Sequence, residues 1–179
     1  MFQQTPLTTY AFLIVITYLG NIISFFVTCN AKEELSMIRT YVKTAQLVTI
    51  LVLGAAMIFF SKFNILSLLM AATLGVCFLL NKEEHKEGYK EKQERMIFPV
   101  LAIMLFAAIQ EKERLMIINV SAFILLYTLL STTLMLDRKF QEKTKASPLH
   151  LKNPIKETLL YNSSYLFTGL FLILLNSLW

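Results

Sequence analysis

The side chains in this chain whose types and spacing suit chemistry are hydroxyl and amide groups set inside two long apolar stretches. In the stretch 115–136, Thr128, Ser131 and Thr132 recur at the spacing that places side chains on one face of a helix. Ser164, Tyr165 and Thr168 recur similarly within 158–179. Such groups either hydrogen-bond between membrane helices or line a path for a neutral ligand. The candidates for either role are Asn119, Thr128, Ser131, Thr132, Ser164, Tyr165 and Thr168.

Other chemistry is missing from the sequence. The cores of the apolar stretches contain no Asp, Glu, Lys, Arg or His, the residues that usually mark proton relays and ion-coupled transport inside a membrane. There is no GxSxG, HExxH or glycine-rich phosphate loop. The two cysteines, Cys29 and Cys77, belong to no CxxC or Cys/His cluster. We therefore expect no metal and no cofactor, and the sequence favours a non-catalytic role over an enzymatic one.

The elements that carry these groups are predicted from the distribution of charge. Apolar residues make up 56% of the chain and charged residues 16%, and the charges are bunched so that long apolar stretches remain between them. A helix needs about 20 residues to cross the hydrocarbon core of a bilayer. The sequence predicts an all-α, polytopic helical membrane protein, a single domain over 1–179 with about six transmembrane helices arranged as hairpins. The predicted spans are 7–28, 40–60, 65–80, 96–110, 115–136 and 158–179.

Basic residues predict the orientation of these spans. Of the 17 Lys and Arg residues, 14 fall in the connections after the first, third and fifth spans, and three fall on the other side. Basic residues gather on the cytoplasmic side of membrane proteins. We expect the charged segments 81–95 and 137–157 to be cytoplasmic, both termini to be non-cytoplasmic, and the membrane to be the plasma (inner) membrane.

The segment 137–157 interleaves basic and apolar residues, a pattern typical of a chain lying on a membrane surface, although an ordinary solvated loop would also fit. The net charge of +5 would suit nucleic acid in a soluble protein. Because the basic residues here flank apolar helices, anionic lipid headgroups are the expected partner instead. The headgroup candidates are Arg138, Lys139, Lys143, Lys145, Lys152 and Lys156.

Local spacing gives three further expectations. A polar link over 30–36 should separate the first two spans. Pro99 should lie in the first turn of its helix, where proline is tolerated. The spans 115–136 and 158–179 follow one another and should be neighbours, and their polar faces should mediate helix contact, inside the chain or with a partner.

These observations favour a non-catalytic integral subunit or accessory partner of a larger membrane complex, or a homo-oligomer. An alternative is a small transporter or binding subunit for a neutral or amphipathic ligand, which would use the polar faces of the last two spans. A further alternative is a lipid-modifying enzyme whose site would include His150, Lys152 and Lys156.

Overall fold

The computed structural model describes residues 6–60, 75, 87–110, 114–145 and 154–177. Within these ranges the chain forms six helices and no strands, which confirms the all-α prediction for this part of the protein. The predicted span 65–80 lies outside the described residues except for Gly75. The helices are α1 (Pro6–Asn30), α2 (Lys32–Phe60), α4 (Glu87–Gln110), α5 (Arg114–Lys145), α6 (Pro154–Tyr161) and α7 (Ser163–Ser177).

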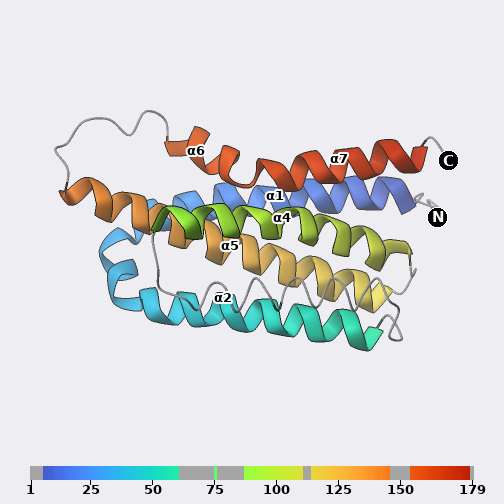
Figure 1. Cartoon of the computed structure of the whole chain (residues 1–179), viewed down its shortest axis with the longest axis horizontal. Helices are drawn as coiled ribbons and strands as arrows, with labels where there is room; N and C mark the ends of the chain where they lie inside the picture. The colour runs from blue at the N-terminus through green and yellow to red at the C-terminus, as the bar shows by residue number, and fades with distance from the viewer. Residues whose placement is uncertain (1–5, 61–74, 76–86, 111–113, 146–153, 178–179) are drawn as a thin grey trace.

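The helices lie side by side in an elongated bundle (Figure 1). The start of α1 and the end of α7 lie at one end of the bundle, and the starts of α2 and α4 lie at the other (Figure 1). α1 packs against both α5 and α7, α2 packs against α5, and α4 packs against α7 and α5. The expected contact between the spans 115–136 and 158–179 is made mainly where α5 meets α6, and α1 joins α5 to α7 over the remainder.

The apolar core is built around α4. Ile97, Phe98, Leu101 and Leu105 are all buried, and their spacing places them on one broad face of the helix. α4 packs against α7 and α5. The ring of Phe98 also meets that of Tyr161 edge-on, with centroids 5.6 Å apart, which ties α4 to α6.

The prediction that Pro99 lies in a first turn is wrong. α4 begins at Glu87, so Pro99 stands in the interior of the helix. The earlier start follows from the residues of 87–95, mostly Glu, Lys, Gln and Arg, which are good helix formers. Since proline has no N–H, the carbonyl of Arg95 loses its usual donor in this helix.

The predicted polar link over 30–36 is also wrong. Ala31 alone separates α1 from α2, and its N–H donates to the carbonyl of Val27 at 2.9 Å. α2 starts at Lys32 because the next residues are good helix formers, and glutamates suit the positive end of a helix dipole. α5 likewise continues past the predicted span to Lys145.

The last predicted span is divided into two helices. α6 ends at Tyr161 and α7 begins at Ser163, with Asn162 in a turn between them. The N–H of Tyr165 donates to the carbonyl of Asn162 at 3.0 Å, so α7 starts immediately after the break. Asn and Ser side chains compete with helical backbone bonding, and Asn162 is followed by two serines.

Two helical segments of the described chain are long and apolar enough to cross a membrane. They are Leu7–Asn30, with a mean hydropathy of 2.1, and Arg114–Lys139, with a mean hydropathy of 2.0. Two shorter apolar segments, Met96–Gln110 and Ser163–Asn176, fall below the length of a full crossing. Length and composition thus give weak support for a membrane location.

Candidate functional site

A stripe of buried polar residues runs along one face of α1. Thr17, Asn21, Ser24 and Thr28 are separated by four, three and four residues, and each is buried. This spacing keeps all four on the side of the helix that faces α5 and α7. We call this stripe and its hydrogen-bond partners on α5, α6 and α7 the polar seam.

The centre of the polar seam is a three-residue hydrogen-bond cluster. The hydroxyl of Thr132 on α5 donates to Oδ1 of Asn21 at 2.8 Å. The amide nitrogen of Asn162, at the break between α6 and α7, donates to Oγ1 of Thr132 at 2.9 Å and also to Oδ1 of Asn21. All three residues are fully buried. One cluster therefore joins three parts of the chain that are far apart in sequence.

The cluster leaves two polar atoms outside its hydrogen bonds. These are Nδ2 of Asn21 and Oδ1 of Asn162, for which the described residues provide no hydrogen-bond partner. An unsatisfied buried polar group costs about 1–3 kcal/mol. The side chains involved are neutral hydroxyls and amides, so the centre of the polar seam can bind through hydrogen bonds but carries no group that exchanges protons near neutrality.

Further hydrogen bonds extend the polar seam in both directions from this centre. The hydroxyls of Thr17 and Tyr165 are 2.6 Å apart and join α1 to α7. The hydroxyls of Ser24 and Thr133 are 2.7 Å apart and join α1 to α5. Ser24 also donates to the carbonyl of Leu129 at 2.9 Å. Each of these bonds connects two helices, as expected of polar residues that hold membrane helices together.

The predicted site residues are distributed unevenly around the polar seam. Thr132 and Tyr165 belong to it. Ser131 lies beside it, and its hydroxyl is 3.3 Å from that of Tyr161 on α6. Thr128 is equally buried, but its hydroxyl donates to the carbonyls of Ile124 and Leu125 within its own helix. The remaining predicted residues, Asn119, Ser164 and Thr168, are half-buried.

Close approach of the helices around the polar seam depends on two glycines. A Cβ added at Gly20 on α1 would lie 2.7 Å from Cδ1 of Leu125 on α5. A Cβ added at Gly169 on α7 would lie 2.7 Å from Cδ1 of Ile14 and within 3.3 Å of two more of its carbons. Small residues at these crossings let the backbones come near enough for the hydroxyl and amide groups to bond.

An ion pair lies at the end of the bundle where α2 begins. Nε of Arg39 on α2 is 3.3 Å from Oδ2 of Asp137 on α5, and the Asp137 side chain is only 7% exposed. Arg39 lies at the start of α2, among other charged residues, and its side chain is turned toward this carboxylate. Because α5 continues through Asp137 as a helix, this residue packs inside the bundle and does not begin a surface segment.

The predicted headgroup residues fall at this same end of the bundle, as far as the structure describes them. Arg138 and Lys139 are half-buried on α5, and Lys156 is exposed near the start of α6. The backbones of Lys143 and Lys145 lie in the last turns of α5, and Lys152 lies outside the described residues.

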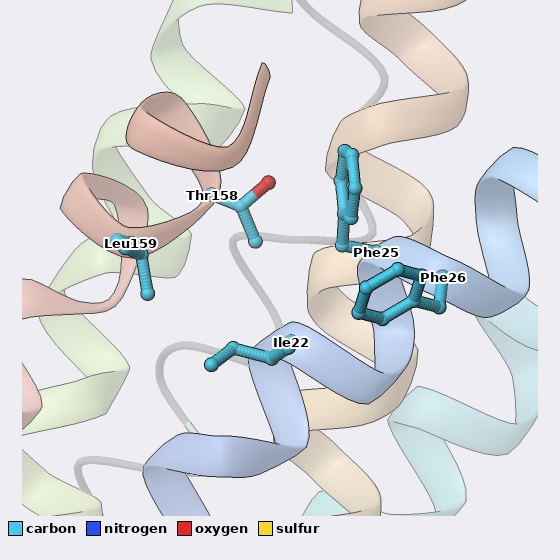
Figure 2. Close-up of a pocket in the computed structure, with 5 residues that line it drawn as sticks. All are labelled: Ile22, Phe25, Phe26, Thr158 and Leu159. Carbon is cyan, nitrogen blue, oxygen red and sulfur yellow. The ribbon is translucent and has the colours of Figure 1, made fainter. Parts of the chain in front are cut away.

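A small apolar hollow lies between α1 and α6, close to the polar seam. Its volume is about 80 Å³, and it is lined by Ile22, Phe25, Phe26, Thr158 and Leu159. Figure 2 shows these five side chains arranged around one space, with the α1 residues facing those of α6. The hydroxyl of Tyr18 on α1 donates to the carbonyl of Leu159 on α6 at 2.6 Å and so joins these two helices beside the hollow.

Sequence reasoning identified the polar faces of α5 and α7 but missed the stripe on α1. The signal was present, because Thr17, Asn21, Ser24 and Thr28 have the same helical spacing as the predicted sets. Within the described residues, no group of His, Cys, Asp and Glu side chains is placed to hold a metal ion.

Comparisons with protein-family models, with curated proteins and with solved structures find no match to this chain.

Proposed function

We propose that the chain is a six-span integral membrane protein that acts as a non-catalytic subunit or assembly partner of a larger membrane complex. The observation that carries this proposal is the inverted distribution of polarity in the bundle. Phe12 on α1 and Phe167 on α7 are 65% and 71% exposed, whereas Asn21 and Asn162 are completely buried. A water-soluble protein rarely exposes large contiguous apolar surface, so an apolar outer face favours lipid or another membrane protein as its surroundings.

The hydrogen bonds of the polar seam support a role in helix assembly. Thr132, Tyr165 and Ser24 each use their hydroxyls to join two helices. Between helices in lipid there is little hydrophobic driving force, so close packing and hydrogen bonds carry the association. The seam is thus suited to holding the bundle in one arrangement and presenting its outer faces to a partner.

The six-span topology is tested by labelling single cysteines in a background where Cys29 and Cys77 are replaced by serine. Cysteines at Gln3, Arg114 and Ser177 should react with an impermeant maleimide added to intact cells. Cysteines at Lys90 and Lys145 should react only after the cells are opened. Labelling of the Lys90 position from outside would refute the topology.

The subunit role is tested by purifying the tagged chain from its own membranes in a mild detergent. A second integral protein, or further copies of this chain, should copurify in a fixed ratio. Copurification of a small molecule with a monomeric chain would instead establish the binding or transport alternative. Turnover of lipid headgroups by the pure chain would establish the enzyme alternative.

A further inference from the structure

Two buried amides in the polar seam have complementary groups left over. The N–H groups on Nδ2 of Asn21 are donors, and Oδ1 of Asn162 is an acceptor. Both residues are completely buried, and neither atom has a hydrogen-bond partner among the described residues. A single group that accepts from the first and donates to the second would satisfy both, and a hydroxyl group has this property.

The start of α7, next to Asn162, also favours the binding of an oxygen atom. α7 begins at Ser163, and the first N–H groups of a helix have no partner within the helix. Together with the helix dipole, they create a partial positive charge at this end. The break therefore favours a neutral oxygen acceptor or an anion. Because Asn162 also offers an acceptor oxygen that an anion cannot use, a hydroxyl fits the combination better.

The apolar hollow lies one helical turn from both amides. Two residues that line the hollow show this. Phe25 follows Asn21 by four residues on α1, and Thr158 on α6 precedes Asn162, which follows the last residue of α6, by four residues. Ile22 and Leu159 face one another across the hollow (Figure 2). Phe26, on its rim, is exposed on the outer surface of α1, as is Leu160 on α6. A hydrocarbon chain in the surrounding lipid thus has a short apolar route to the neighbourhood of the amides.

We propose that the junction of α1 with the α6–α7 break binds the hydroxyl group of a neutral amphiphile from the membrane, with the first carbons of its hydrocarbon chain in the hollow lined by Ile22, Phe25 and Leu159 and the rest of the chain outside the bundle. Nδ2 of Asn21 donates to the hydroxyl oxygen, and Oδ1 of Asn162 accepts its proton. An apolar lining favours a hydrocarbon chain, and a water molecule would leave the hollow unused. This inference rests on the proposed membrane location and goes beyond the assembly role, on which it does not depend.

The experiment uses the full chain in nanodiscs and hexadecan-1-ol carrying a diazirine on a carbon close to the hydroxyl. A matched probe has the same chain without the hydroxyl. After irradiation, the alcohol probe should label peptides containing Phe25 or Leu159. Since the difference between the probes is a hydroxyl held by two hydrogen bonds, unlabelled hexadecan-1-ol should compete about tenfold better than hexadecane.

A pair of neighbouring variants provides the control. Ile22→Phe fills the hollow and leaves the amides unchanged, so labelling by the alcohol probe should fall about fivefold or more. Ile23→Phe makes the same change on an exposed side chain and should leave labelling unchanged. Both variants should retain the thermal unfolding temperature of the parent within a few degrees, and both should retain the partner yield that the assembly role requires.

Three results would overturn the proposal. Equal labelling by the two probes would show that the hydroxyl is not recognised. Undiminished labelling in Ile22→Phe would place the chain elsewhere. Absence of labelling in a folded parent protein would show that the amides are closed to amphiphiles and bind water at most. In each case the purification experiment would still decide the assembly role separately.

Discussion

Replacing Thr132 by valine tests whether the polar seam stabilises the bundle through hydrogen bonds between helices. The change removes one hydroxyl and nearly conserves the shape of the side chain. It abolishes the bond to Asn21 at 2.8 Å and the bond from Asn162 at 2.9 Å. Hydrogen bonds between membrane helices contribute about 0.6 kcal/mol on average and up to about 1.7 kcal/mol. Loss of these two bonds should lower the free energy of unfolding by about 1–2 kcal/mol. The loss should be no larger, because the bond from Asn162 to Asn21 remains in the variant.

Thr128→Val is the matched control for this measurement. Thr128 lies one turn away on α5 and is equally buried, but its hydroxyl bonds only to carbonyls of its own helix. We expect this variant to change the free energy of unfolding by less than about 0.5 kcal/mol, since valine leaves those carbonyls in their helical bonds. The assay is reversible unfolding by sodium dodecyl sulfate in mixed micelles, followed by circular dichroism. If both variants lose the same stability, hydrogen bonding across the polar seam is not what holds these helices together.

Other perturbations test the remaining contacts. Gly169→Ala should destabilise the bundle by about 1–3 kcal/mol in the same unfolding assay, because the added Cβ would meet the stiff, β-branched side chain of Ile14. Gly75→Ala is the control: it has open space around it and should be neutral or slightly stabilising. Arg39→Ala should lower the free energy of unfolding by about 2 kcal/mol, which is less than the roughly 3–5 kcal/mol of a fully buried pair because Arg39 is 27% exposed. Arg39→Lys should recover part of this loss. An unchanged unfolding midpoint for Arg39→Ala would show that the pair with Asp137 contributes nothing. Lys156→Gln should reduce the stabilisation of the chain by phosphatidylglycerol by about 1 kcal/mol at low salt. The measurement is thermal unfolding in vesicles of increasing anionic lipid content. Equal responses of the parent and the variant would contradict a headgroup contact at this residue.

The helical architecture could be predicted because it depends on local sequence. Apolar stretches bounded by charged runs specify where helices must occur, and within the described residues helices occur at each of those places. Helix ends were predicted less well. Charged residues such as those of 87–95 are good helix formers, so α4 extends well beyond its apolar part and includes Pro99 in its interior.

The polar seam could be predicted only in part, because it depends on which helices meet. The spacing of Ser131 and Thr132 places them on one face of α5, and both are buried. Nothing in that spacing shows that Asn21, more than a hundred residues earlier, is the partner of Thr132. The pairing of Arg39 with Asp137 is likewise a property of the assembled bundle, because both residues belong to charged runs that a sequence alone assigns to the surface.

The break at Asn162 has a consequence for the order in which the protein is made. α6 has 8 residues and α7 has 15, so α7 reaches only about 22 Å along its axis, less than the roughly 30 Å of a hydrocarbon core. With Asn162, Ser163 and Ser164 between its apolar parts, this segment is a poor candidate to enter lipid by itself. Its contacts with α1 and α5 are made by groups that are synthesised earlier and are already in place. In the proposed six-span topology, insertion of the last segment would depend on helices that are already in the bilayer, and deletion of α1 should leave this segment outside the bilayer.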